Sequence, residues 1–143
     1  MTRNVREFES NQPVTVSVRL ARVAYFVSIL LLIVGIFLEV FFAGEIMLVN
    51  ASTLIQHRDF GQVLGLVPIL IFVSALGARL PQRLLILSGL PAVLYAMQYI
   101  FLYGLGGLGL PLDLKALHAV NALVMFWVAQ YLARIAWKIV RAR

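Results

Sequence analysis

The chain contains only two histidines, His57 and His118, and each stands at the beginning of a long apolar run. Imidazole nitrogens are common metal ligands, and side chains on facing helices of a bundle can hold a metal or cofactor between them. The absence of cysteine excludes disulfides, thiolate metal sites and iron–sulfur clusters. The chemistry available to this chain therefore depends on whether the two imidazoles meet.

The elements that must position them are four apolar runs without a charged residue. They cover residues 23–38, 60–78, 84–112 and 116–133. At about 1.5 Å per helical residue, such runs approach the roughly 30 Å hydrocarbon thickness of a bilayer. Hydrophobic residues make up 62% of the chain and charged residues 13%, whereas a soluble domain carries about 25% charged residues. We predict an all-α polytopic membrane protein with helices at residues 19–42, 56–78, 82–103 and 113–137.

Most of the basic residues lie at one end of this predicted bundle. They are Arg3, Arg6, Arg19, Arg22, Arg79, Arg83, Arg134, Lys138, Arg141 and Arg143. Because Lys and Arg near membrane spans stay in the cytoplasm, we predict an up-down four-helix transmembrane bundle with both termini cytoplasmic, in a bacterial cytoplasmic (inner) membrane. The net charge of +6 then reflects topology. It indicates no nucleic-acid partner, although the basic end could favour anionic membrane lipid.

The chain is expected to form one domain. Residues 1–18 are polar and predict a cytoplasmic arm, whereas residues 19–140 predict the four-helix transmembrane domain. Residues 43–56 mix apolar and polar side chains too evenly for a span and predict an interfacial segment. The glycine-rich residues 104–111 predict an external hairpin, and Asp113 is the expected N-cap of the fourth helix. We expect the first helix to be retained, because its apolar stretch exceeds the core of a signal peptide.

In an up-down bundle the second and fourth helices run parallel, so His57 and His118 lie at the same depth within about one helical turn. They could face each other across the core. The residue one turn deeper than each histidine is small, namely Gly61 and Ala122. A porphyrin between two imidazoles needs the helix backbone close to its faces, and these two residues leave that room.

Other residues near the histidines fit such a cofactor. Met125 shares the face of His118 and could help to enclose a macrocycle, and Arg58 or Lys115 could receive its propionates. The corresponding prediction is a six-coordinate haem b, which carries one electron and has no open site for oxygen.

Glu39 is the other charged group at membrane depth. An unpaired carboxylate there would cost about 2–3 kcal/mol, so Glu39 should face inward or reach water. It could accept a hydrogen bond from the free imidazole N–H of either histidine and orient that ligand. Alternatively, it could only pair with Arg58.

The histidines also have a structural interpretation. Gly61 and Gly65 have the spacing of small residues in closely packed membrane helices, and a histidine at a helix start can be half-solvated. Methionines beside the histidines would suit copper, but thioethers in apolar helices usually fill gaps in the core. Gln98 and Asn121 are uncharged candidates for an interhelical hydrogen bond. Candidates for the interfacial aromatic belt are among Trp127, Trp137, Tyr95, Tyr99, Tyr103 and Tyr131. No catalytic constellation is visible, so enzymatic activity stays undecided.

Several short motifs resemble a bacterial family of four-span membrane proteins of unknown function. They are Gln56-His57-Arg58 followed by Gly61 and Gly65, Leu117-His118 followed by Asn121-Ala122-Leu123, and the segment Leu38-Glu39-Val40-Phe41-Phe42-Ala43-Gly44. The resemblance covers residues 20–140.

The same pattern is similar to one half of haem A synthase, a four-helix unit with histidines at the outer starts of its second and fourth helices and an acidic residue nearby. This resemblance implies that His57 and His118 are axial haem ligands and that Glu39 is their acidic neighbour. Haem A synthase has two such halves and this chain has one, so the resemblance does not imply oxidation of a haem substituent by this chain alone.

Three hypotheses follow. The first is a small membrane b-type cytochrome-like protein that binds one haem near the external face and exchanges electrons with a quinone or a redox partner protein. The second is a cofactor-free accessory or structural subunit of a larger respiratory, photosynthetic or transport complex, or of a homo-oligomer. A channel or carrier is a weaker third, because the spans hold so few polar groups. An absorption spectrum separates the first two.

Overall fold

The computed structural model describes residues 15–104 and 114–141, and this part of the chain contains helices and turns but no strand. Four helical spans are each long and apolar enough to cross a membrane. The first span is α2 (Val16–Leu48), and the second consists of the 3₁₀ turn η1 (Ala51–Thr53), α3 (Leu54–Leu64) and α4 (Leu66–Gly77). The third consists of α5 (Gln82–Tyr99) and the π-helical turn η2 (Ile100–Gly104). The fourth consists of the 3₁₀ turn η3 (Leu114–Ala116) and α6 (Leu117–Arg141). The predicted all-α multi-pass fold is confirmed.

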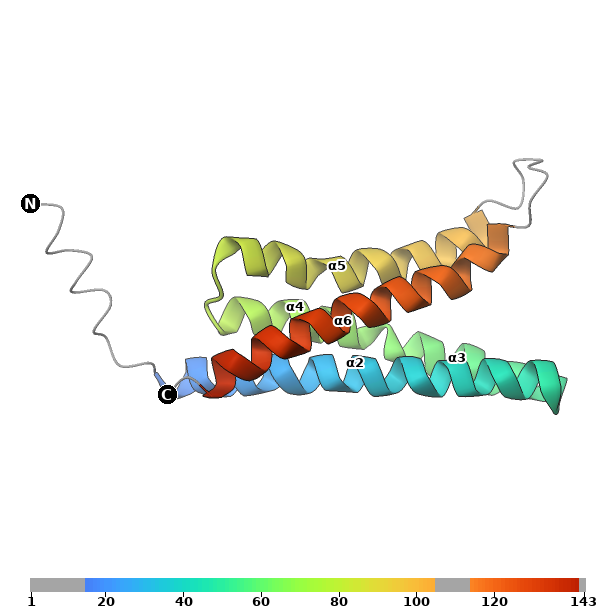
Figure 1. Ribbon diagram of the computed structural model, residues 1–143, viewed down its shortest axis with the longest axis horizontal. Coiled ribbons are helices and arrows are strands. Elements are labelled where there is room, and N and C mark those ends of the chain that lie inside the picture. The colour runs from blue at the N-terminus through green and yellow to red at the C-terminus, as the bar shows by residue number, and fades with distance from the viewer. Residues whose placement is uncertain (1–14, 105–113, 142–143) are drawn as a thin grey trace, which may run out of the picture.

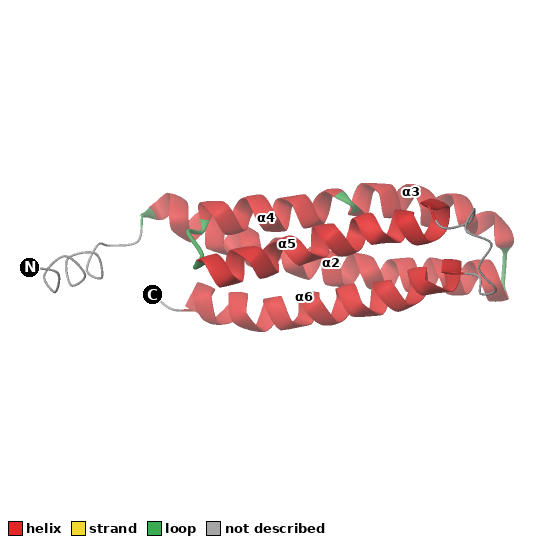
Figure 2. Ribbon diagram, turned by 90° about the horizontal axis from the view of Figure 1, so that it is seen from above, coloured by secondary structure: helices red, strands yellow, loops and turns green. Residues whose placement is uncertain are grey.

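The spans lie side by side in an up-down bundle (Figure 1). The contacts show that each span packs against two neighbours, so the four spans form a ring in cross-section. Helix α2 contacts α3 and α4 on one side and α6 on the other, and α5 contacts α4 and α6. Successive spans run in opposite directions (Figure 2). The second and fourth spans therefore run parallel on opposite corners of the ring, as the sequence predicted.

Apolar side chains fill the core and also cover the outside of the bundle. The largest fully buried side chains are those of Tyr25, Ile29, Leu32, Ile71 and Leu132. Outward-facing Leu31, Leu70 and Leu123 are each more than half exposed. Helices that are apolar on every face are typical of membrane spans, because the solvent around them is lipid.

The prediction of an interfacial segment at residues 43–56 was wrong. Helix α2 continues to Leu48, the second span begins at Ala51, and only residues 49 and 50 connect them. Nothing in residues 43–48 breaks a helix, and a hydrogen-bonded backbone is favoured wherever water is scarce. Asn50 forms the turn by accepting a hydrogen bond from the Ser52 backbone N–H at 3.0 Å. The first span is consequently 33 residues long, or about 50 Å.

The second span is interrupted at Gly65, which the sequence analysis did not predict. Pro68 has no backbone N–H, so the carbonyl of Leu64 loses its usual partner four residues later. The helix is reset between α3 and α4 at this point. This break lies two turns below His57, and both halves of the span pack against α2.

Three expectations fall wholly or partly outside the described residues: the polar arm at 1–18, the hairpin at 104–111 and the N-cap at Asp113. Of the arm, only residues 15–18 are described, and α2 already begins at Val16. Of the hairpin, only Gly104 is described, as the last residue of η2. The fourth helix extends to Arg141, beyond the predicted end at residue 137.

A buried hydrogen bond joins the first and third spans, and its removal should be measurable. The Tyr25 hydroxyl donates to Ser88 Oγ at 2.7 Å, because the Ser88 hydroxyl proton is used toward the Leu84 carbonyl, also at 2.7 Å. Interhelical hydrogen bonds in membranes are worth about 0.6–2 kcal/mol. We expect Tyr25→Phe to lower the free energy of unfolding in mixed micelles by that amount. Tyr131→Phe, at an exposed position on α6, should have no effect, and equal losses in both variants would refute this assignment.

Candidate cofactor site

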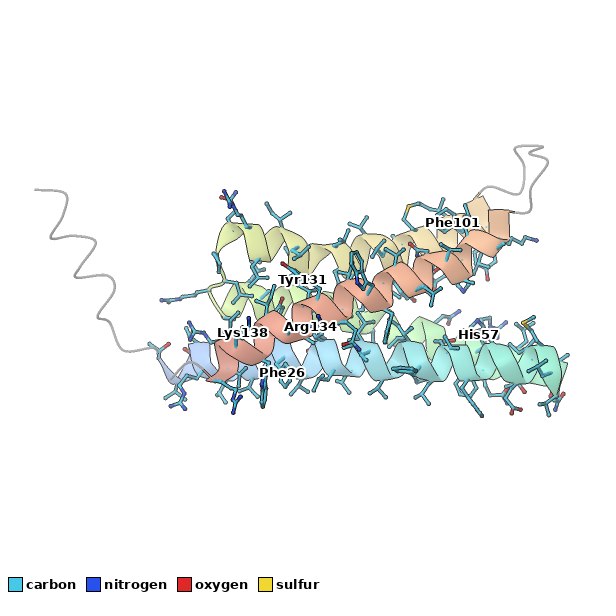
Figure 3. The ribbon with its side chains drawn as sticks, in the orientation of Figure 1. Phe26, His57, Phe101, Tyr131, Arg134 and Lys138 are labelled. Carbon is cyan, nitrogen blue, oxygen red and sulfur yellow. The ribbon has the colours of Figure 1, made fainter. Side chains whose placement is uncertain are left out.

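The structure brings the two histidines together at one end of the bundle, which we call the histidine end. The ring centroids of His57 on α3 and His118 on α6 lie 6.3 Å apart, and the ring planes meet at 82°. Both residues sit near the start of parallel spans on opposite corners of the ring, so their side chains approach across the interior. Figure 3 shows His57 at this end, beside α2.

Glu39 of α2 contacts the Nδ1 atom of His57 through its carboxylate. The two side chains are only 16% and 24% exposed, respectively. Arg58 turns away and pairs instead with Asp59, at 3.1 Å between Nε and Oδ1 in an exposed position. The alternative in which Glu39 pairs with Arg58 is therefore wrong. The contact occupies Nδ1 and leaves Nε2, on the other edge of the His57 ring, as the nitrogen that can bind a ligand.

Gly61 lies one turn below His57, and the Glu39 carboxylate covers it. A Cβ atom added to Gly61 would stand 3.0 Å from Glu39 Oε1. From the sequence, this space was expected to admit the face of a porphyrin, whereas in the structure the Glu39 carboxylate lies against it. The small residue at position 61 thus serves the Glu39–His57 contact directly.

Tyr95 of α5 closes the site on the next corner of the ring. Its hydroxyl donates to the Gly61 carbonyl at 2.9 Å and lies 3.0 Å from the Tyr99 hydroxyl. The Tyr95 ring passes directly over Gly65, where an added Cβ would stand 2.2 Å from the ring carbon Cζ. Gly65 therefore permits the close approach of α5 to the second span.

From the sequence, both tyrosines were expected in the interfacial belt, and this inward role of Tyr95 was not predicted. The available signal was their position on the same face of the third span as Gln98.

The third span also contributes polar groups near His118. Gln98 is buried and its backbone lies beside the His118 ring. Asn121 of α6 donates from Nδ2 to the Leu94 carbonyl at 2.8 Å, which confirms an interhelical hydrogen bond for that residue. Gln98 Oε1 and His118 Nδ1 are buried, and neither forms a hydrogen bond with the described part of the chain. All four spans thus supply polar groups to one buried cluster.

The remaining predicted site residues lie at different levels. Ala122 is half-buried one turn below His118, and Met125 is buried in the core with Ile36 and Leu64 among its cluster. Lys115 is exposed at the histidine end. Within residues 15–104 and 114–141, no group of three or more His, Asp or Glu side chains could hold a metal ion.

Comparison with known proteins gives one family. The profile of a family of unknown function (DUF6220) matches residues 39–104. The chain is similar to that family over a segment that begins at Glu39 and includes His57, Gly65, Tyr95 and Gln98 but not His118. No curated protein and no solved structure matches the chain. A similarity to a family of unknown function is thus found, and a similarity to haem A synthase is not.

Proposed function

We propose that this chain is a small integral-membrane b-type cytochrome-like protein that binds one haem b through His57 and His118. The observation that carries this proposal is the 6.3 Å separation of the two imidazole centroids. With metal–imidazole bonds of about 2 Å on either side of one metal ion, two such rings have their centres about 6 Å apart. The separation therefore suits axial ligation of a single metal ion.

The donor set favours a haem over a bare metal ion. Structural metal sites take about four protein ligands, and no group of three or more candidate ligand side chains occurs in the described residues. A haem supplies the equatorial nitrogens itself and needs from the protein only the two axial ligands. Two imidazoles and no third ligand are what such a cofactor requires.

The chain's own residues prepare His57 for this role. A carboxylate at Nδ1 holds the ring proton there, fixes the tautomer and the ring orientation, and makes Nε2 a better ligand. Glu39 occupies that position, and Gly61 keeps its carboxylate in place. A haem held by two histidines supplies one-electron transfer without an open site for oxygen. We propose a quinone or a redox protein as its electron partner.

The direct experiment is a spectrum of the purified full chain from haem-replete cells. We expect a reduced-minus-oxidised difference spectrum of a b-type cytochrome, with one haem per chain by pyridine haemochrome assay. A colourless protein would overturn the proposal. In that case a cofactor-free accessory subunit would be the surviving hypothesis, and co-purification of a partner complex after mild extraction would test it.

The role of Glu39 gives a separate prediction. Removing a carboxylate that orients a metal-bound histidine lowers metal affinity by about 10–100-fold, and we expect Glu39→Ala to weaken haem retention to this extent. Glu39→Gln keeps an acceptor oxygen and should restore most of the affinity, which a general loss of packing would not allow. Glu45→Ala, on the same helix, is the matched control. If it weakens haem binding as much as Glu39→Ala, Glu39 has no orienting role.

We further propose that the chain lies in a bacterial inner membrane with both termini in the cytoplasm and the histidine end outside. Because the chain has no cysteine, single cysteines report topology without background. Ser52→Cys should react with an impermeant maleimide in spheroplasts, whereas Gln82→Cys should react only after permeabilisation. The opposite labelling pattern would reverse the orientation.

A further inference from the structure

The other end of the bundle, at which α2 begins and α6 ends, carries cations without described counter-ions. We call it the basic end. Arg19 and Arg22 of α2 lie there with Arg134, Lys138 and Arg141 of α6. The ion pairs Glu39–His57 and Arg58–Asp59 both lie at the histidine end. The cations at the basic end therefore repel one another unless an anion binds among them.

Helices α2 and α6 are held together at this end by aromatic contacts. The rings of Phe26 and Trp137 have centroids 5.4 Å apart, and the guanidinium carbon of Arg141 lies 5.0 Å from the Trp137 centroid. The two helices run in opposite directions, so Arg22, one turn before Phe26, and Arg141, one turn after Trp137, lie at the same level. Figure 3 shows Phe26 and Lys138 close to the point where α6 crosses α2.

Arg22 is distinguished from the other cations by its burial. Its Nε atom is buried and finds no hydrogen-bond partner in the described part of the chain. A buried guanidinium N–H without an acceptor is costly, and the partner that suits a guanidinium best is a carboxylate or phosphate. The described carboxylates are all at the opposite end, so the acceptor must come from outside the described residues.

The surroundings of Arg22 identify the kind of anion. One to two turns further along α2, Val27 and Leu30 lie on the outer side of the helix, where they are 45% and 40% exposed, respectively, within the apolar span. Trp137 is half-exposed at the same level as Phe26, a position typical of the membrane interface. A ligand with a phosphate group would pair with the Arg22 guanidinium, and its acyl chains would cover the apolar outer side of α2.

We propose that the junction of α2 and α6 at the basic end binds the phosphate headgroup of an anionic phospholipid. Arg22 and Arg141 contact the phosphate, Trp137 lies beside the headgroup, and the acyl chains lie along Val27 and Leu30. Basic positions between transmembrane helices recognise anionic headgroups in this way. The inference is independent of the proposed haem site, which lies at the other end of the bundle.

The test measures lipid binding to the purified full chain in a mild uncharged detergent, with native mass spectrometry as the readout. Phosphatidylglycerol should bind about tenfold more tightly than phosphatidylcholine. Both lipids carry a phosphate, but phosphatidylglycerol has a net negative charge, whereas the choline cation of phosphatidylcholine is repelled by the arginines. Arg22→Gln should remove most of this preference. Arg141→Gln, at the exposed end of α6, should reduce it without affecting the fold, so misfolding of the first variant cannot explain both results.

The control is Arg83→Gln. This substitution also removes a charge from the basic end, but Arg83 is in the first turn of α5, away from the junction of α2 and α6. It should change the preference by less than about threefold, since a single distant surface charge contributes little. An equal loss in Arg83→Gln and Arg22→Gln would overturn the proposal, because it would indicate only a general positive field. Equal binding of the two lipids, or displacement of phosphatidylglycerol by millimolar inorganic phosphate, would also overturn it.

Discussion

Replacing His118 by alanine is expected to abolish the low-spin haem spectrum of the purified protein. The chain has two histidines and no cysteine, so no other imidazole or thiolate can substitute as an axial ligand. Loss of an axial ligand should weaken haem retention by more than the about 10–100-fold that follows loss of an orienting neighbour. The measurement is the haem-to-protein ratio together with the reduced-minus-oxidised spectrum. His57→Ala should give the same spectral loss.

The two histidine variants differ in a way that checks the site. His57→Ala leaves the Glu39 carboxylate buried without its partner, and an unpaired carboxylate in a membrane span costs about 2–3 kcal/mol. His118→Ala leaves no comparable charge, so it should fold better than His57→Ala. Gln62→Ala, at an exposed position on α3, is the control and should keep the full spectrum. Retention of an unchanged spectrum by either histidine variant would refute bis-histidine ligation.

Gly65→Ala is expected to lower the free energy of unfolding of the described bundle. The added methyl group would stand 2.2 Å from Tyr95 Cζ and 2.3 Å from its hydroxyl oxygen. The ring would have to move and would lose its 2.9 Å hydrogen bond to the Gly61 carbonyl. Such overpacking costs about 1–3 kcal/mol. Unfolding in mixed micelles measures the loss.

A double variant and a matched glycine test the stated cause. In a Tyr95→Leu background the clash is removed, so Gly65→Ala should cost at least about 1 kcal/mol less than in the wild-type chain. Gly44→Ala is the matched control, because an added Cβ at Gly44 meets nothing within 4 Å. It should be neutral or slightly stabilising. Additive effects of the Gly65 and Tyr95 substitutions would show that the ring contact is not responsible.

The sequence predicted the spans well because the bilayer imposes a simple rule. A spanning segment must be helical, apolar and about 20 residues long, and the four charge-free runs meet that requirement. The helix ends were less predictable. Residues 43–48 extend α2 although they contain polar groups, since the choice between helix and surface segment depends on local packing. The break at Gly65 depends on the missing N–H of Pro68, which hydropathy does not register.

The depth of the candidate site could be predicted from the sequence, whereas the rotation of each helix could be predicted only in part. His57, His118 and Glu39 were placed at one level because charge and imidazole positions mark depth along a span. Their orientation was inferred from the need to hide polar groups from lipid. Tyr95 was misplaced because a tyrosine suits both an interfacial belt and an inward hydrogen bond. Only Gln98, on the same face of the helix, marked that face as polar.

Electron paramagnetic resonance of the oxidised purified protein tests the central claim most directly. The ring planes of His57 and His118 meet at 82°, and ferric haems with nearly perpendicular axial imidazoles give a low-spin signal dominated by one large g value. We predict that signal, and its loss in His118→Ala. A high-spin signal, or a protein without haem iron, would contradict the assignment of these two histidines as the axial pair.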